Sequence, residues 1–497
     1  MAEESLKAKA VKGVAWSMIG SYSNKFIQFV ISLVLARLLT PADYGLIGML
    51  GFFIGLAGTI IDSGFSNALI RHKDRTDKDF CTVFFINCGL SILMYAILAL
   101  SAPYIAKFYN QPPLIDIIRV YSLTLIIGAF AAINSVVLTI ELRYKTSTLI
   151  STSSAIISGC VGLVFAFLGF GAWALVFQQL AAAIIRACLL FYYVRWIPHF
   201  IFSTESFKKL FGYGSKLLAS GLLHTAYSNM YPLVIGKQFS ATDLGYVARA
   251  QGFNDMAAGT VNGVLSSVAF PVLSKVQDDD QRLLELYEKY IKISAFAICP
   301  IILFLCGVAK PLILLLLTEK WAPSILLLQI LGINYIWDGI IKINLNLLYV
   351  KGRSDLFLRL EIVKKTIAFA ILIISVLIGN LIVFCIGMTV YSTIALYLNT
   401  YYTKKILNFG FLKQMRQIMP YLSFGIIIFL EGLLFSWLIP NNLLSLCISV
   451  LVCIPTYIIL CRVTNQYALY EVLNIVTPKL GRAGIIIQKV IGSNRSI

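Results

Sequence analysis

Residues 80–103 read FCTVFFINCGLSILMYAILALSAP, a run of 24 residues without a charged side chain. At a rise of about 1.5 Å per residue, a helix of this length crosses a hydrocarbon core about 30 Å thick. Apolar runs of about 20 residues recur along the rest of the chain, and each is long enough to do the same. The stretch therefore predicts a membrane-spanning helix, and its recurrence predicts many of them.

The overall composition leads to the same fold class. Of the 497 residues, 59% are hydrophobic and 13% are charged, whereas a soluble domain carries about 25% charged residues. A chain of three or four soluble domains is thereby excluded. A transmembrane β-barrel would show short alternating segments instead of long apolar runs. We expect an all-α, polytopic membrane protein without a separate domain outside the membrane.

The apolar runs can be divided into fourteen predicted spans, separated by turn-forming residues such as Thr40-Pro41 and Gly379-Asn380. Their limits are 14–38, 42–70, 80–103, 114–142, 146–168, 171–194, 210–236, 244–273, 291–317, 323–350, 356–379, 381–403, 419–438 and 441–461. The longest connection, 274–290, reads as a short amphipathic helix of its own.

Positive charges are distributed unevenly between the predicted loops. With a cytoplasmic N-terminus, 28 of the 41 Lys and Arg residues fall on the cytoplasmic side, 5 on the opposite side and 8 inside spans. This bias predicts that both termini are cytoplasmic. It also explains the net charge of +18 without a nucleic-acid partner, because basic loops face anionic lipid headgroups.

A short motif repeats at a spacing of 200 residues. RLLTPADYG at 37–45 matches KQFSATDLG at 237–245, and two further positions match as Phe53/Phe253 and Ser66/Ser266. The repeat predicts two six-helix halves, 1–200 and 201–410, related by a pseudo-two-fold axis along the membrane normal. An extra helix pair (411–462) and a cytoplasmic interfacial tail (463–497) would follow. We also expect Asp43 and Asp243 to cap the helices after the two turns.

The sequence holds few signs of enzymatic chemistry. It contains no GxxxxGK[ST] phosphate loop, and no HExxH or GxSxG motif stands out. The ten cysteines form no CxxC or Cys/His cluster, so no metal, disulfide framework or cofactor is expected. A membrane glycosyltransferase or ligase would place its catalytic residues on a substantial loop, and none is predicted. Movement of a molecule across the membrane remains as the favoured activity.

Polar stripes on the predicted spans suggest where such a molecule would bind. The stripe on span 14–38 comprises Ser17, Ser21, Asn24, Lys25, Gln28 and Ser32. The stripe on span 210–236 comprises Lys216, Ser220, His224, Tyr227, Ser228 and Tyr231. Helix packing through small polar residues explains the serines, but not Lys25, which lies about 16 Å into the bilayer. We favour a hydrated central cavity lined by spans one, two, seven and eight.

Ionisable residues inside the spans fall into three groups. The first group has an opposite charge three or four positions away and reads as structural ion pairs: Asp116/Arg119, Asp338/Lys342 and Glu361 with Lys364 and Lys365. Arg186 and Arg249 lie close enough to span ends for their long side chains to reach the lipid headgroups. Each is therefore either a headgroup-facing residue or a functional residue. Asp62, Asp255 and Glu431 have no such cation and are either proton or cation sites or partners between helices. The candidate set is thus Lys25, Asn24, Gln28, Lys216, His224, Tyr227 and Arg249 for substrate, and Asp62 and Asp255 for ion coupling.

Two segments carry a family resemblance: LARLLTPADYGLIGM at 35–49 and LGYVARAQGFNDMAAGTVNGVLSSVAFPVLSKVQDD at 244–279. With the fourteen spans, they resemble the polysaccharide transporter (Wzx-type) branch of the multidrug/oligosaccharidyl-lipid/polysaccharide flippase superfamily. The resemblance implies a bacterial inner-membrane flippase that moves undecaprenyl-pyrophosphate-linked oligosaccharide repeat units by alternating access. These units would serve O-antigen, capsule or exopolysaccharide assembly, with the polymerase and chain-length proteins of the pathway as partners.

No cavity residue is transferred from the family, because its members vary there. A lipid II flippase and a multidrug or cation antiporter of the same superfamily stay open as alternatives. The antiporters usually have twelve spans and an acid-dominated cavity, so the extra helix pair and the lysines argue against them.

Overall fold

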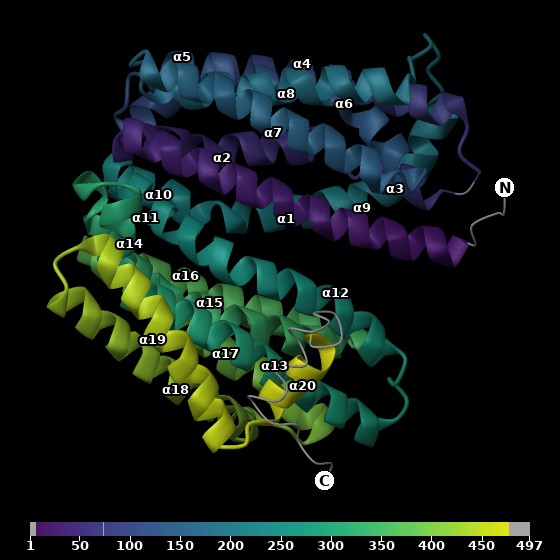
Figure 1. Cartoon of the computed structure of the whole chain (residues 1–497). Coiled ribbons are helices and arrows are strands. Elements are labelled where there is room, and N and C mark those ends of the chain that lie inside the picture. The colour runs from purple at the N-terminus through teal and green to yellow at the C-terminus, as the bar shows by residue number, and fades with distance from the viewer. Residues whose placement is uncertain (1–5, 73, 477–497) are drawn as a thin grey trace. The chain divides into compact units, whose positions relative to one another are not determined.

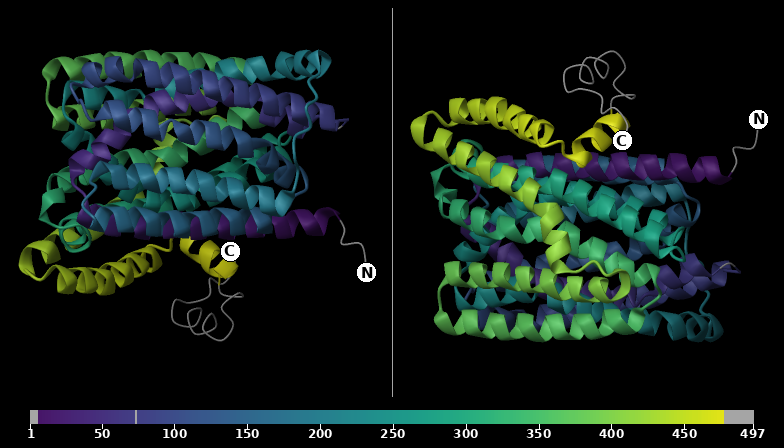
Figure 2. Two further views of the ribbon diagram at one scale, coloured as in Figure 1. Left: turned by 90° about the horizontal axis from the view of Figure 1, so that it is seen from above. Right: turned by 90° about the horizontal axis from the view of Figure 1, so that it is seen from below.

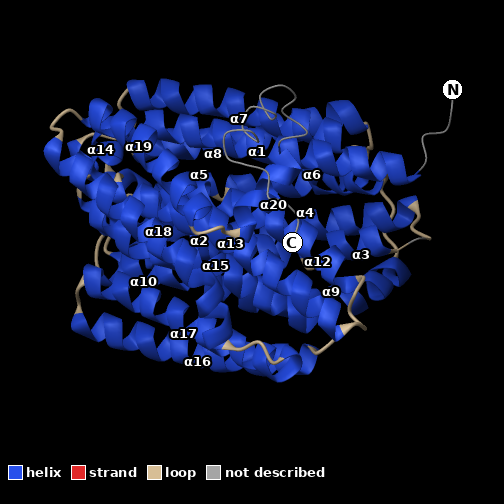
Figure 3. Ribbon diagram, turned by 60° about the horizontal axis from the view of Figure 1, so that its bottom comes forward, coloured by secondary structure: helices blue, strands red, loops and turns tan. Residues whose placement is uncertain are grey.

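The computed structural model describes residues 6–72 and 74–476, and every regular element within these ranges is a helix (Figure 3). The chain is divided between Ala248 and Arg249 into two compact units. The all-α class predicted from the apolar runs is confirmed.

The first unit is a bundle of long helices that run side by side (Figure 1). It holds α1 (Leu6–Leu38), α2 (Pro41–Asp62), α3 (Phe65–Arg71), α4 (Asp77–Tyr109), α5 (Leu114–Tyr121), α6 (Leu123–Ile140), α7 (Tyr144–Phe167), α8 (Ala172–Val194), α9 (Thr204–Ser228), α10 (Met230–Gln238) and the first part of α11 (Ala241–Asn254). Helix α7 packs between α1 and α8, while α9 and α10 pack on α2.

The second unit begins within α11 and holds the remaining elements. They are η1 (Asp255–Gly259), α12 (Thr260–Ser274), α13 (Asp280–Gly307), α14 (Ala309–Leu316), η2 (Glu319–Trp321), α15 (Pro323–Val350), α16 (Ser354–Ile378), α17 (Leu381–Leu407), α18 (Phe411–Leu438), α19 (Asn442–Val463) and α20 (Tyr467–Val476). Helix α13 packs on α15 and α18, and α18 pairs with α19 as an antiparallel hairpin (Figure 2).

Ten helical segments among the described residues are long and apolar enough to span a membrane. The chain is therefore a multi-pass membrane protein. Four of the fourteen predicted spans, 14–38, 210–236, 244–273 and 356–379, are not among the ten. The first three carry polar side chains along their length, and the fourth carries a cluster of charges. The count of fourteen stays a prediction.

Some element boundaries differ from the predicted ones. The predicted span 42–70 is broken between α2 and α3 by two left-handed residues, Ser63 (φ 44°) and Gly64 (φ 72°). The connection 274–290 does not form a helix of its own, because α13 starts at Asp280 and continues into the span. Leu283, Tyr287 and Ile291 are buried at a four-residue spacing, so one apolar stripe joins the two parts.

The two repeated turns have matching caps, with one correction to the predicted roles. Thr40, rather than Asp43, is the N-cap residue of α2, and Asp43 is the third helical residue of a capping box. The Thr40 hydroxyl donates to Asp43 Oδ2 at 2.7 Å, and the Ser240 hydroxyl donates to Asp243 Oδ2 at the same distance. Thr and Ser accept a bond from the aspartate N–H in both turns.

The same two turns also approach each other closely within the first unit. A Cβ placed on Gly45 would lie 1.6 Å from the carbonyl oxygen of Ala241, and one on Gly245 would lie 1.9 Å from that of Pro41. Because 45/245 and 41/241 are equivalent repeat positions, this contact is reciprocal. This reciprocal contact agrees with a local two-fold relation between the two turns. Two predictions remain predictions: the axis between the two halves, and the domain limits 1–200, 201–410, 411–462 and 463–497.

The three predicted ion pairs along single helices are formed. Asp116 and Arg119 lie 3.6 Å apart, and Asp338 and Lys342 lie 2.6 Å apart. Glu361 pairs with Lys364 and, at 3.7 Å, with Lys365. These charges are therefore neutralised locally, as their spacing indicates.

Candidate functional site

Three residues of the polar stripe of α1, Asn24, Gln28 and Ser32, line a cavity of about 610 Å³ inside the first unit. We call it the polar chamber. Helices α2, α5, α6, α7 and α8 complete its wall. Its polar lining residues are Asn24, Gln28, Ser32, Tyr44, Tyr121, Thr124, Ser151, Ser154, Ser158, Gln178, Gln179 and Arg186.

The chamber exists because α7 carries small hydroxyl residues where α1 and α8 approach it. Ser151, Ser154 and Ser158 recur at helical spacing and lie on the chamber side of α7. Ser154 donates a hydrogen bond to the backbone carbonyl of Ala182 on α8 at 2.9 Å. Small polar residues of this kind let membrane helices pack closely, and their short side chains leave the space between the three helices open.

The chamber combines many neutral hydrogen-bonding groups with a single charge. Gln28 Nε2 donates to Asn24 Oδ1 at 3.4 Å, so both amides keep capacity for another partner. Arg186 of α8 is exposed, and its guanidinium has no ion pair with any residue in the described ranges 6–72 and 74–476. Amide and hydroxyl groups hydrogen-bond a polyhydroxylated ligand, and a guanidinium attracts an anionic one.

A second cavity, also of about 610 Å³, lies between α2 and α9 in the same unit. It brings together two predicted site residues, Asp62 and His224. The Ser66 hydroxyl donates to the Asp62 carboxylate, and Thr59 and Thr225 are joined by a hydrogen bond of 2.9 Å across the two helices. A carboxylate and an imidazole at one cavity are groups that can take up protons or a cation.

The two predicted lysines lie on exposed parts of the first unit. Lys25 on α1 and Lys216 on α9 line neither of these two cavities. Neither ammonium group forms an ion pair with any described residue. Asp62, proposed above as a possible partner between helices, therefore does not pair with Lys25. The side chains of Ser17 and Ser21, from the same predicted stripe, lie outside the described residues.

The remaining predicted residues are distributed over both units. Tyr227 is partly buried on α9. Arg249 belongs to the second unit and is only 8% exposed, with its guanidinium 5.3 Å from the ring centre of Trp321. Stacking on an aromatic ring accounts for a buried arginine better than extension to the headgroups. Asp255 is exposed at the first residue of η1, a π-helical turn in the second unit.

Sequence reasoning missed most of the polar chamber. The missed residues include Ser154 and Ser158 on α7 and Gln178 and Gln179 on α8. The signal that could have found α7 is its serine stripe, which resembles the stripe of α1. The amides of α8 gave a weaker signal, because only the packing shows that they share a cavity with Asn24.

Comparisons with known proteins place the chain in a family. The family described as "Polysaccharide biosynthesis protein" matches residues 34–326. The teichuronic acid biosynthesis protein TuaB of Bacillus subtilis (strain 168) is 25% identical over 354 residues, covering 71% of this chain and 73% of that protein. The lipopolysaccharide biosynthesis protein WzxC of Escherichia coli (strain K12) is 25% identical over 398 residues, covering 80% of each.

The fold has a counterpart among solved structures. The lipid II flippase MurJ, in an inward closed conformation, superposes with a TM-score of 0.73 at 13% identity, covering 91% of this chain and 99% of that one. At this identity the likeness shows the fold alone. Because the family match covers more than half of the sequence, the chain belongs to the polysaccharide biosynthesis protein family.

Proposed function

We propose that the protein is a flippase for undecaprenyl-pyrophosphate-linked oligosaccharide repeat units in the bacterial inner membrane, working by alternating access. It would be a transporter and not an enzyme. The observation that carries the proposal is the polar chamber, with its amides, hydroxyls and one guanidinium inside a bundle of membrane-spanning helices. The family and the relatives, whose names refer to lipopolysaccharide and teichuronic acid biosynthesis, support it.

The chemistry of the substrate explains why such a chamber is needed. A glycan and a pyrophosphate cannot cross hydrocarbon without replacing their hydrogen bonds to water. Neutral groups such as Asn24, Gln28 and Gln178 supply those bonds to sugar hydroxyls, while Arg186 and the exposed Lys25 and Lys216 attract the pyrophosphate. The isoprenoid tail can stay in the bilayer throughout.

Coupling to an ion gradient would use the cavity between α2 and α9. Asp62 and His224 both line it, and Thr225 joins α9 to Thr59 of α2. A change of protonation at Asp62 or His224 would change the charge between two helices that pack on each other. Asp255 remains a second coupling candidate in the other unit. No cofactor enters this mechanism.

The charge distribution and the family support the cellular setting of this proposal. We propose that both termini are cytoplasmic, because most basic residues fall in the loops of that side. The lipid-linked oligosaccharide and membrane lipids are direct partners in this account. The polymerase and chain-length proteins of the same pathway would take over the product on the outer side.

The test is complementation of a bacterial strain that lacks its own polysaccharide flippase. We expect the wild-type chain to restore surface polymer and Arg186→Gln to lower it by about tenfold or more, since a charge-assisted hydrogen bond is lost. Arg359→Gln, at another exposed arginine, is the matched control and should complement. Normal polymer from Arg186→Gln at equal membrane level would rule the chamber out as the substrate path. Rescue of lipid II export or drug efflux in place of polymer would point to the two alternative transporters.

A further inference from the structure

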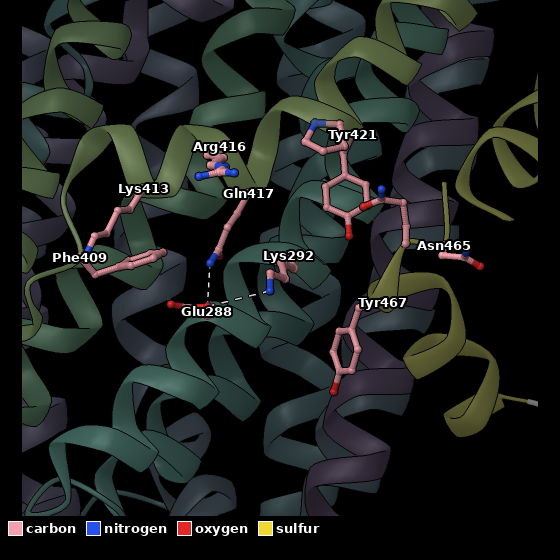
Figure 4. Close-up of a pocket in the computed structure, with 11 residues that line it drawn as sticks. Glu288, Lys292, Phe409, Lys413, Arg416, Gln417, Tyr421, Asn465 and Tyr467 are labelled. Atoms are coloured by element: carbon pink, nitrogen blue, oxygen red, sulfur yellow. Dashed lines mark hydrogen bonds and ion pairs between the residues drawn. The ribbon is translucent and has the colours of Figure 1, made fainter. Parts of the chain in front are cut away.

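A third cavity, also lined by polar residues, lies in the second unit, where α13, α18 and the start of α20 meet. It has a volume of about 610 Å³, which is within the range of small-molecule sites, about 300–1,000 Å³. Figure 4 shows Lys413, Arg416 and Gln417 on one stretch of α18, with Gln417 bonded to Glu288 of α13 and Lys292 beside that carboxylate. We call it the basic pocket. None of its lining residues belongs to the polar chamber or to the cavity between α2 and α9.

The basic pocket carries more positive than negative charge. Its three cations are Lys292, Lys413 and Arg416, and its one carboxylate is Glu288. Glu288 is already engaged, because it accepts a hydrogen bond from Gln417 Nε2 at 2.7 Å and lies 3.9 Å from Lys292 Nζ. The pocket therefore has an excess of two positive charges.

Two of the cations have no carboxylate partner among residues 6–72 and 74–476. Lys413 Nζ donates to the backbone carbonyl of Asn408 at 2.8 Å, which is a neutral partner. The exposed Arg416 has no ion pair with any residue in the described parts of the chain. An anion of other origin is the natural partner for these side chains.

The pocket wall is held in place by a contact from α20. Lys289 of α13 forms an ion pair with Glu471, and this contact fixes α20 against α13. Tyr467, at the start of α20, lines the pocket together with Tyr421 of α18. Tyrosine, with an apolar ring and a polar hydroxyl, is enriched at the level of lipid headgroups.

Exposed apolar side chains flank the basic stretch of α18 and indicate what kind of anion fits. Leu412, which is 82% exposed, directly precedes the pocket residue Lys413, and Met419, which is 54% exposed, lies one helical turn after the pocket residue Arg416. A free phosphate uses only the cations, whereas a lipid places its phosphate on the cations and its chains on the apolar surface. All three cations also belong to segments that the charge distribution places on the cytoplasmic side, where basic pockets between helices bind anionic lipid headgroups.

We propose that the basic pocket binds the phosphate group of an anionic membrane lipid. The source of that phosphate is either a glycerophospholipid of the bilayer or the isoprenoid-linked diphosphate of the transport substrate. The second source rests on the proposed function, and the first does not.

The experiment measures lipid binding to the purified full-length chain by native mass spectrometry. The probes are dioleoylphosphatidylglycerol, undecaprenyl diphosphate and inorganic phosphate, with dioleoylphosphatidylcholine as the zwitterionic reference. The double variant Lys413→Gln/Arg416→Gln should weaken phosphatidylglycerol binding by about 30-fold, on the scale of surface Lys and Arg contacts to anionic lipid. Lys404→Gln/Lys405→Gln, which removes two exposed lysines of α17, should leave it unchanged.

The outcomes separate the proposal from its rivals. Equal phosphatidylglycerol binding by both double variants would overturn the pocket, as would inorganic phosphate binding as tightly as the lipids. Variant-sensitive binding that is tighter for undecaprenyl diphosphate assigns the pocket to the substrate, and tighter binding of phosphatidylglycerol assigns it to the bilayer. Arg416→Lys keeps the charge and should retain most binding, which guards against a folding defect in the double variant. Polymer production by the chamber variants is a separate readout, so failure here does not test the flippase function.

Discussion

Lys25 combines a predicted depth near the bilayer centre with the absence of any ion pair among the described residues. An uncompensated ammonium at that depth costs at least about 2.5–3.5 kcal/mol on insertion scales. A charge retained at this cost is most simply explained by a mobile anionic partner. The neighbouring Asn24 and Gln28 line the polar chamber, so a pyrophosphate held by Lys25 would place its sugars within reach of the chamber amides.

Replacing Lys25 tests this role. Lys25→Ala should insert normally but lower polymer production by about tenfold or more, because a charged hydrogen bond to the substrate is lost. Lys25→Arg should retain part of the activity, since the cation persists with a different shape. Lys107→Ala, at another exposed lysine of the first unit, is the control. Full activity of Lys25→Ala at equal membrane level would show that the lysine does not hold the substrate.

The reciprocal glycine contact gives a second test at single residues. Gly45→Ala or Gly245→Ala should lower the thermal unfolding midpoint of the detergent-purified protein, because each new Cβ meets backbone that cannot move aside alone. Overpacking of this kind costs about 1–3 kcal/mol. Gly58→Ala, where no atom lies within 4 Å of the new Cβ, should leave the midpoint almost unchanged. Equal midpoints for all three variants would show that the turns do not pack as described.

Residue-level prediction succeeded where the interaction is local. The ion pairs of Asp338 and Glu361 depend only on a spacing of three or four residues, which the sequence displays directly. The capping box of α2 is equally local, but the prediction assigned the cap to Asp43 instead of Thr40. The wall of the polar chamber depends on which helices are neighbours, and that information is absent from a single sequence. The stacking of Arg249 on Trp321 could not be predicted for the same reason, since the two residues lie 72 positions apart in the sequence.

At the scale of elements, α20 is attached by its buried residues Ala468 and Leu469 and by the ion pair between Glu471 and Lys289 of α13. The hydrogen bond from Lys289 lowers the pKa of Glu471 below its usual value. A carboxylate whose pKa is lowered in the folded state stabilises that state at pH values above the pKa of the unfolded state, which is about 4.3 for Glu. This stabilisation is lost as the pH falls through the pKa of the folded state. Docking of α20 should therefore persist at neutral pH and weaken in acid.

Hydrogen exchange of the α20 amides between pH 7 and pH 3 measures this dependence once corrected for intrinsic exchange. Protection in the wild type should fall below about pH 4. Glu471→Gln should show weak protection throughout, with little further change in acid. A wild-type profile that matches Glu471→Gln at neutral pH would contradict the role of the Lys289 contact.

The elements themselves were largely predictable, because long apolar runs define membrane helices with little ambiguity. The breaks inside them were not. Ser63 and Gly64 interrupt a predicted span through their left-handed backbone, and a π-helical turn at Asp255 interrupts another. Both breaks occur next to polar residues, where an apolar pattern is weakest and packing decides the backbone.

At the scale of the whole molecule, the charge distribution predicts the topology. Single cysteines introduced at Lys107 and Lys237 should react with a membrane-impermeant maleimide added to intact cells, since both positions fall on the periplasmic side. A cysteine at Arg143 should react only after the membrane is opened. Because the chain has ten native cysteines, the labelling starts from a variant in which these are replaced. Labelling of Arg143→Cys in intact cells would overturn the predicted number of spans.

The central claim is that this chain moves a lipid-linked oligosaccharide from one leaflet to the other. The most direct measurement uses purified protein in vesicles that contain undecaprenyl-pyrophosphate-linked oligosaccharide, with an impermeant lectin reporting how much glycan becomes accessible from outside. Wild-type vesicles should show a rise in accessible glycan toward completion, and Arg186→Gln vesicles a much slower rise. Accessible glycan that stays at the level of protein-free vesicles, with correctly folded protein and an imposed proton or sodium gradient, would contradict the account.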